Sequence, residues 1–181
     1  MNGTSSLENT TVVVTGATGF IGSHLVDYLI EHGCIVHALV RETSDRRWLN
    51  KSDQVEVHTV DLLKNSPINC LQKADYLFHC AGLTKAKTRD DYFSGNVDSC
   101  ETLYERCVSI GANLKAIVHL SSLAAAGPSI MGEPAQEKNS CKPVTYYGES
   151  KLAGEEIALK YASLLPIVII RPPVVYGPRE K

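Results

Sequence analysis

The stretch VTGATGFIGSHL, Val14 to Leu25, places three glycines, at positions 16, 19 and 22, between two kinds of apolar pattern. The β-branched run Thr11–Thr15 at its start is typical of a buried strand, and the apolar residues that follow recur at helical spacing. A glycine turn between strand and helix lets an anion approach the unpaired N–H groups of the helix N-terminus. The stretch therefore predicts a phosphate-binding turn. Three glycines also fit an ordinary turn, so the rest of the chain has to support the interpretation.

The order of strand and helix recurs along the chain. Short runs of β-branched and apolar residues alternate with longer stretches whose apolar residues recur every three or four positions. The segments after Val40 and after Asp61 carry neither pattern clearly and are predicted to be irregular. The predicted strands are Thr11–Thr15, Cys34–Val40, Val55–Val60, Asp75–Cys80, Ala116–Leu120 and Pro166–Ile170, and the predicted helices run from about Phe20 to Gly33, Asp91 to Cys107 and Tyr146 to Leu164.

Strands that alternate with helices predict an α/β domain with a parallel sheet, because parallel neighbours need crossover connections. The preferred handedness of such crossovers favours a Rossmann-type doubly wound sheet, three layers deep, with strand order 3-2-1-4-5-6. We expect one domain over residues 11–181, preceded by a flexible N-terminus at residues 1–10.

The composition narrows the classes of function. With 181 residues, 44% hydrophobic and 21% charged, the chain can form one domain with a real core. A net charge of −2 argues against a nucleic-acid partner, and no apolar run approaches the roughly 20 residues of a membrane span. The polar N-terminus lacks a signal-peptide core, which predicts a cytoplasmic protein with reduced thiols. The six histidines show no ligand spacing on any helix, so no metal site is predicted.

The end of the second predicted strand indicates which dinucleotide the domain would bind. NAD-binding sheets of this type usually carry a carboxylate there, which holds the ribose hydroxyls. This chain has Val40 and then Arg41, whose guanidinium suits a 2′-phosphate. The sequence therefore favours NADP. In the alternative, Arg41 is a solvated arginine, Glu42 holds the ribose and the cofactor is NAD.

Two further strand ends carry residues that suit the same ligand. Asp61 and Leu62 follow the third predicted strand, where a short side chain can meet an adenine amino group. Ala81 and Gly82, followed by Thr84, come after the fourth strand, where a ribose can lie against the backbone. Each of these segments also fits an ordinary loop, so neither one by itself indicates a dinucleotide site.

Candidate catalytic residues follow the fifth strand. Tyr147 and Lys151 are four residues apart and share a face of the predicted helix. A tyrosine hydroxyl ionises near pH 10, and a neighbouring ammonium stabilises the phenolate so that proton exchange becomes feasible. Ser122, at the preceding strand end, could hydrogen-bond a substrate oxygen. Tyr146 is a rival for the hydroxyl role, but it is five residues from Lys151 and faces elsewhere.

The segments TGATGFIG, YGESKLAGE and RPPVVYGP together resemble the extended short-chain dehydrogenase/reductases, the NAD(P)-dependent epimerase/dehydratase group. The resemblance runs from about Thr11 to Pro178. The segment VRETSDRR is more similar to the NADP-using branch around dihydroflavonol reductases and hydroxysteroid dehydrogenase-like enzymes. The resemblance implies a catalytic triad of Ser122, Tyr147 and Lys151. It implies that Gly16, Gly19 and Gly22, with Phe20 and Ile21, hold the pyrophosphate, that Lys151 also touches the nicotinamide ribose, that Pro172 and Val175 position the nicotinamide, and that Asn96 is structural. With the residues at the strand ends, the predicted cofactor contacts are Gly16, Thr18, Gly19, Phe20, Ile21, Gly22, Arg41, Asp61, Leu62, Ala81, Gly82, Thr84, Tyr147, Lys151, Pro172 and Val175.

These observations predict an NADP-preferring oxidoreductase that moves hydride between nicotinamide and a carbonyl or secondary alcohol carbon. The first alternative is a sugar-nucleotide epimerase or dehydratase with tightly bound NAD, in which Lys85, Lys87 and Arg89 could meet a substrate diphosphate. The second is a non-catalytic dinucleotide sensor, against which the intact Ser-Tyr-Lys set argues.

Members of the family continue past VYGP with a last strand and a small substrate domain, whereas this sequence stops at Lys181. The resemblance therefore predicts that the substrate domain is missing here. It also suggests a homodimer formed through the helices predicted at Asp91–Cys107 and Tyr146–Leu164.

Overall fold

The computed structural model describes residues 7–64, 66–129, 133, 134 and 136–180. Its centre is a six-stranded parallel sheet with the order β3-β2-β1-β4-β5-β6, which confirms the predicted Rossmann-type fold. Each strand is shorter than or equal to its predicted range. The strands are β1 (Thr11–Thr15), β2 (Ile35–Val40), β3 (Val55–Thr59), β4 (Tyr76–His79), β5 (Ala116–Leu120) and β6 (Ile167–Ile170).

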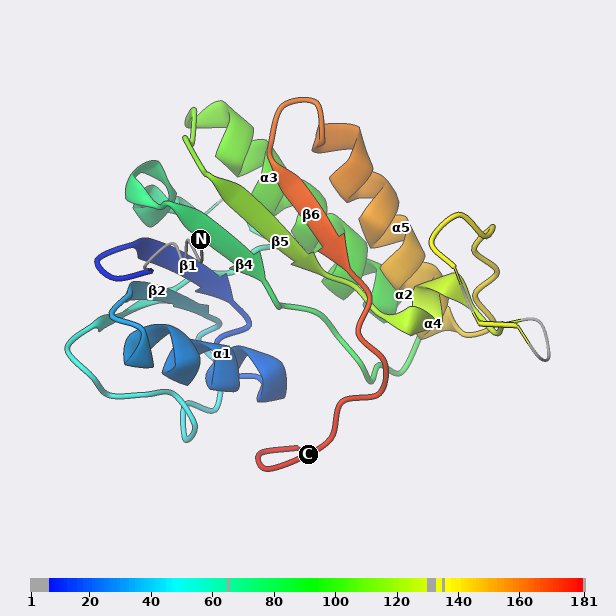
Figure 1. Cartoon of the computed structure of the whole chain (residues 1–181), viewed down its shortest axis with the longest axis horizontal. Coiled ribbons are helices and arrows are strands. Elements are labelled where there is room, and N and C mark those ends of the chain that lie inside the picture. The colour runs from blue at the N-terminus through cyan, green and yellow to red at the C-terminus, as the bar shows by residue number, and fades with distance from the viewer. Residues whose placement is uncertain (1–6, 65, 130–132, 135, 181) are drawn as a thin grey trace, which may run out of the picture.

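Helices lie on both faces of this sheet, as Figure 1 shows. Helix α1 covers β1 and β2 on one face, while α3 and α5 lie behind β5 and β6 on the other (Figure 1). The helical elements are α1 (Phe20–Glu31), the 3₁₀ helix η1 (Asn69–Lys73), α2 (Arg89–Phe93), the π-helical turn η2 (Ser94–Asp98), α3 (Ser99–Ser109), α4 (Leu123–Ala126) and α5 (Tyr146–Tyr161).

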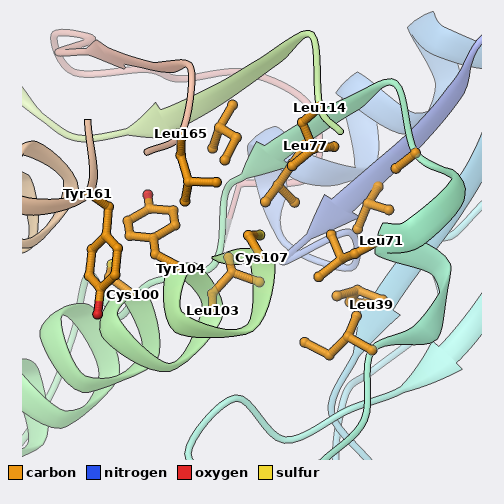
Figure 2. Close-up of a cluster of buried hydrophobic side chains, with 14 of the residues drawn as sticks. Leu39, Leu71, Leu77, Cys100, Leu103, Tyr104, Cys107, Leu114, Tyr161 and Leu165 are labelled. Atoms are coloured by element: carbon orange, nitrogen blue, oxygen red, sulfur yellow. The ribbon is translucent and has the colours of Figure 1, made fainter. Parts of the chain in front are cut away.

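The sheet separates two hydrophobic cores. Alternate residues of β1 point to opposite faces, so Val12 and Val14 pack under α1 while Val13 faces α3 and α5. Figure 2 shows the second core, where Tyr104 and Leu103 of α3 meet Leu77 of β4. Because β1 is buried on both faces, its run of valines reads as continuous rather than alternating.

The largest difference from the predicted helices lies between residues 89 and 109. One helix was expected over Asp91–Cys107, and the structure instead has α2, the turn η2 and α3 in succession. The side chain of Asn96 is drawn to the neighbouring 83 loop, where it accepts from Leu83 N–H at 2.6 Å and donates to Leu83 O at 3.0 Å. These bonds accompany the wider π turn, a feature often found near functional sites. The expected irregular stretch after Asp61 also contains a short helix, η1.

The two ends of the described chain lie against the N-terminal half of the domain. Residues 1–6 of the predicted flexible N-terminus lie outside the described residues, while Asn9 N–H donates to Gly33 O at 2.9 Å. After β6 the chain returns towards α1, where Arg179 forms an ion pair with Asp27 at 2.7 Å (Figure 1). No helix among the described residues is long and apolar enough to span a membrane.

The sheet is covered unequally. On the face that α1 covers over β1 and β2, the side chains of β6 remain exposed, Val168 by 53% and Ile170 by 43%. Figure 1 shows β6 in front of α3 and α5 with no helix of the described chain over it. This exposed strand is the neighbour of β5 in the sheet. The candidate catalytic residues lie just after β5 and in the first turns of α5.

Candidate active site

A pocket of about 570 Å³ opens at the carboxyl ends of the strands, next to the point where the strand order reverses between β1 and β4. Open α/β sheets bind their ligands at such a switch point. The pocket brings together eight of the predicted cofactor residues, from four different strand ends. They are Gly16, Thr18, Gly19, Arg41, Asp61, Leu62, Ala81 and Gly82.

The glycine turn packs too closely to hold side chains. Gly16 has a φ of 64°, and a Cβ there would lie 2.7 Å from Ala81 N. A Cβ on Gly22 would lie 2.2 Å from Gly16 O, so the first turn of α1 rests directly on the loop. Gly19 caps α1 without a side-chain hydrogen bond. The first N–H groups of α1 therefore stay available to an anion beside the pocket.

The opposite rim of the pocket carries Arg41 and Asp61. The backbone N–H of Arg41 donates to Ser44 Oγ at 3.0 Å, which fixes the chain as it leaves β2. The pKa of Asp61 is lowered, first by the backbone N–H of Leu63 at 3.0 Å and then by Lys64, with a smaller contribution from the charge of Arg41. The rim therefore combines an ionised carboxylate with a guanidinium.

The two other arginines of this loop have partners within the protein. Arg46 donates to Thr59 Oγ1 at 3.1 Å, and Arg47 pairs with Asp45 at 2.5 Å. Arg41 is the arginine of this segment that lines the pocket.

Lys151 links the pocket to the candidate catalytic edge, by which we mean the side of the sheet that carries Ser122, Tyr147 and Lys151. It lies on α5, is 6% exposed, and donates from Nζ to Leu120 O at the end of β5 at 2.7 Å. A Cβ on Gly82, which lines the pocket, would lie 3.7 Å from that Nζ. Burial lowers the pKa of Lys151, while nearby Cys100, Glu155 and Cys80 raise it. An ammonium group is thus held behind the pocket wall.

Ser122 and Tyr147 lie on two elements that pack together. Ser122 caps the short helix α4, where its Oγ accepts from Ala124 N–H at 3.2 Å. A Cβ on Gly148, next to Tyr147 in the first turn of α5, would lie 2.4 Å from Ala124 O. Thr145 caps α5 through Gly148 N–H at 3.0 Å and so fixes the start of the helix. Tyr147 is half-buried against the ring of Tyr92, with the ring centroids 6.2 Å apart.

The rival tyrosine and several predicted contacts lie away from the pocket walls. Tyr146 is 56% exposed. Phe20, Ile21 and Gly22 form the first turn of α1 behind the glycine loop rather than its wall. The remaining predicted contacts, Thr84, Pro172 and Val175, lie in exposed or half-buried segments that do not line the pocket.

A chain of hydrogen bonds runs behind the pocket from the end of β4 to the π turn. Ala81 N–H donates to Thr15 Oγ1 at 3.1 Å, which lies 2.8 Å from His79 Nδ1. His79 Nε2 lies 3.1 Å from Cys100 Sγ, and that thiol donates to Asn96 O at 2.9 Å. Since the thiol hydrogen is used on Asn96, His79 donates from Nε2 and accepts the hydroxyl of Thr15 at Nδ1. Burial lowers the pKa of His79, so the ring stays neutral.

Sequence reasoning missed a buried ion pair at the base of the catalytic edge. Glu155, 2% exposed on α5, accepts from Arg171 Nε at 2.8 Å and from its Nη2 at 2.5 Å, and also from the hydroxyl of Ser121. Glu155 follows Lys151 by four residues, so both lie on the buried face of α5. A glutamate one helical turn after Lys151, on the same face of the predicted helix, was the available signal. The pair ties the exit of β6 to the helix that carries Tyr147.

The chain is similar to known proteins of two kinds. It is 35% identical over 170 residues to ceramide reductase of Caulobacter vibrioides, covering 93% of this chain and 47% of that protein. It is 29% identical over 183 residues to UDP-glucose 4-epimerase of Vibrio cholerae, covering 94% of this chain and 53% of that protein. The chain thus spans about half the length of these relatives.

Solved structures give the same result for the fold. UDP-N-acetylglucosamine 4-epimerase of Methanobrevibacter ruminantium, in complex with UDP-N-acetylmuramic acid, matches with a TM-score of 0.86 and 28% identity over 96% of this chain and 58% of that one. UDP-glucuronic acid 4-epimerase of Bacillus cereus, in complex with NAD, matches with a TM-score of 0.83 and 28% identity over 95% and 59%.

The family profile that matches spans most of the domain described above, from the second residue of β1 to the end of the chain. It is that of the NAD dependent epimerase/dehydratase family and it covers residues 12–181. This match confirms the resemblance that the glycine, tyrosine and proline motifs indicated. The protein belongs to the NAD dependent epimerase/dehydratase family.

Proposed function

We propose that the protein is an NADP-preferring oxidoreductase of this family, which moves hydride between nicotinamide and a carbonyl or secondary alcohol carbon. The observation that carries the proposal is the position of Lys151, buried beside Gly82 of the pocket and one helical turn from Tyr147. Its ammonium would therefore serve both the dinucleotide and the tyrosine. A relative that is 35% identical is a reductase, which supports the choice of reaction.

The residues of the pocket fit a dinucleotide. Gly16 and Gly22 leave no room for a Cβ, and α1 begins at the pocket without a side-chain cap, as a pyrophosphate requires. Asp61 and Leu62 would border the adenine, and Ala81 and Gly82 the ribose. The bound nicotinamide would supply or accept the hydride.

The chain's own residues would handle the substrate oxygen and its proton. Tyr147 would donate the proton during reduction and accept it during oxidation, while Lys151 stabilises the phenolate. The Oγ of Ser122 already accepts from Ala124 N–H, so its hydroxyl hydrogen can donate to the substrate oxygen. The three residues would act together as the catalytic triad.

The preference for NADP would come from Arg41. This residue lines the pocket directly after Val40, so the last residue of β2 itself is not a carboxylate that would repel a 2′-phosphate. Arg46 and Arg47 do not line the pocket, and Arg47 is paired with Asp45, so Arg41 would supply most of the charge. The alternative ribose holder, Glu42, does not line the pocket.

A second candidate function is a sugar-nucleotide epimerase with tightly bound NAD. The fold similarity to UDP-sugar epimerases favours it. The loop that could meet a substrate diphosphate argues against it, because Arg89 already pairs with Glu149 at 3.1 Å and lies 4.0 Å over the ring of Phe93.

A deuterium-transfer experiment distinguishes these functions. The whole protein is given NADPH labelled at the transferable position together with a panel of carbonyl compounds, and separately given UDP-sugars with NAD. We expect deuterium in the reduced product and one NADP⁺ formed per product. Interconversion of a UDP-sugar without net cofactor oxidation would replace our proposal with the epimerase. Dinucleotide binding without turnover in either assay would leave a non-catalytic sensor.

A further inference from the structure

Within the described part of the chain, two groups of three metal-ligating side chains come together. The first, His79, Cys100 and His119, is completely buried behind the pocket. Its members already belong to the hydrogen-bond chain from Thr15 or bond to Tyr104. Burial, and after it the charge of Lys151, lowers the pKa of both histidines. The buried Nε2 of His119 has no hydrogen-bond partner among the described residues, but a neighbouring ammonium disfavours a second cation, so no metal is proposed for this group.

The second group lies at the other end of the sheet, on its β2–β3 side, away from Lys151. His37 of β2 is paired with Glu56 of β3, and Leu39 with His58, so all four side chains face the same side of the sheet. His37 Nδ1 lies 2.8 Å from His58 Nε2. The carboxylate of Glu56 lies against the same two nitrogens, 3.3 Å from the first and 3.5 Å from the second.

A thiol from another element completes this group. Cys70, in the helix η1, holds its sulfur within 4.8 Å of the two ring nitrogens. Two imidazoles, a thiol and a carboxylate therefore converge from three segments that are far apart in sequence. They line neither the dinucleotide pocket nor the catalytic edge, and the proposed function does not use them.

The contact between the two rings suits a cation. Two neutral imidazoles that face each other share one proton between two nitrogens, and a cation can take the place of that proton. Glu56 adds a negative charge at the open side of the group, where its side chain is 65% exposed and free to adjust.

We propose that His37, His58 and Cys70, with Glu56 as the fourth ligand, form a site for Zn²⁺ or a similar thiophilic divalent ion. Two nitrogens, one sulfur and one carboxylate oxygen are a tetrahedral zinc set, whereas Mg²⁺ and Ca²⁺ prefer oxygen alone. Bonds of about 2.0–2.1 Å to nitrogen imply nitrogens roughly 3.3 Å apart, so the two rings would separate by about half an ångström on binding.

Binding displaces protons that the free protein holds. Burial raises the pKa of Cys70 to about 11, so the thiol is protonated at neutral pH. The new zinc–sulfur bond replaces the S–H bond, and the thiol proton leaves to solvent. The proton shared by the two histidines moves to the outward-facing nitrogen of one ring. The ion would then tie β2 and β3 to η1.

The test uses Co²⁺ as a spectroscopic probe on the reduced, metal-stripped whole protein. We expect one Co²⁺ per chain and a near-ultraviolet thiolate-to-cobalt band, both displaced by Zn²⁺. Cys70→Ser should abolish the band and weaken Co²⁺ binding at least tenfold. His58→Gln should weaken binding by a similar factor. Zn²⁺ should also raise the thermal midpoint of wild type in a way that a chelator reverses.

Cys100→Ser is the matched control, because Cys100 belongs to the other histidine–cysteine group. It should keep both the band and the affinity. The absence of the band and of stoichiometric binding in wild type would overturn the proposal. Unchanged binding by a folded Cys70→Ser protein would do the same, as would loss of the band in Cys100→Ser alone.

Discussion

The pocket at the strand ends and the candidate catalytic edge differ in how completely the described chain builds them. All the residues that line the pocket lie between positions 15 and 99, and its strands β1 and β2 are covered by α1 on one face. The candidate catalytic residues Ser122, Tyr147 and Lys151 lie after β5 and on α5, beside a strand with one apolar face open. The pocket is therefore walled by four strand ends within the first hundred residues, whereas the candidate catalytic edge has one face uncovered.

The segment after β6 also leaves large apolar side chains exposed. Val174 is 87% exposed and Tyr176 83%, although both are large and apolar. The chain spans about half the length of its relatives, which is consistent with the expectation of a separate substrate domain. That expectation remains a prediction.

The largest effect on turnover should come from removing the hydroxyl group of Tyr147. In the whole protein, Tyr147→Phe should lower turnover by roughly 10² to 10⁴, the usual scale of acid–base catalysis. The dinucleotide Kd should change little, because the pocket walls do not include Tyr147. The measurement is steady-state turnover with a parallel NADPH titration. Tyr146→Phe, on the exposed neighbour, is the control and should leave turnover intact. Near-normal turnover in Tyr147→Phe would contradict the assignment.

The next-largest effect tests the glycine turn at the pocket and leaves the candidate catalytic residues unaltered. Gly22→Ala would place a Cβ 2.2 Å from Gly16 O, so the loop backbone has to move. Overpacking of this kind costs about 1–3 kcal/mol, and we expect the dinucleotide Kd to rise by roughly 5- to 150-fold.

Gly111→Ala is the control for loss of a glycine. Gly111 has a φ of 62° but nothing within 4 Å of an added Cβ. It should lower stability by about 1–2 kcal/mol and leave the dinucleotide Kd unchanged. Equal Kd values for the Gly22→Ala and wild-type proteins would show that the turn does not hold the ligand.

A smaller effect concerns the choice of cofactor at the pocket rim. A charge-assisted pair between Arg41 and a 2′-phosphate is worth about 1.5–3 kcal/mol, so wild type should prefer NADP over NAD by about ten- to a hundredfold. Arg41→Ala should remove most of this preference by weakening NADP alone. Arg47→Ala is the matched control, since Arg47 pairs with Asp45. Titration of both dinucleotides decides it, and equal affinities in wild type would favour the epimerase.

The sequence predicted what depends on local pattern. The six strands, their order and the glycine turn follow from the spacing of apolar residues, the positions of turn-forming residues and the handedness of crossovers. The structure confirms the fold. Tyr147 and Lys151 were placed on one helix by their spacing alone.

Features that depend on distant pairing could not be predicted. His37 and His58 become neighbours only through the register of β2 and β3, and Arg171 meets Glu155 only because β6 packs beside α5. The π turn at Asn96 has the apolar spacing of a continuous helix, and only the bonds of that side chain to Leu83 reveal its different geometry.

The smallest effect tests the unequal cover of the sheet. Val168 of β6 is 53% exposed, whereas Val12 of β1 is fully buried, and Thr has nearly the shape of Val. In residues 1–181, Val168→Thr should change the free energy of unfolding by no more than about 0.5 kcal/mol, because its hydroxyl stays in water. Val12→Thr should cost about 1–3 kcal/mol, since the buried hydroxyl would lose its hydration. Urea unfolding of both variants measures the two values under one condition. An equal cost at both positions would mean that the face of β6 is covered in solution, as by a second copy of the chain. The difference in exposure between β1 and β6 would then hold only for a single copy of the chain.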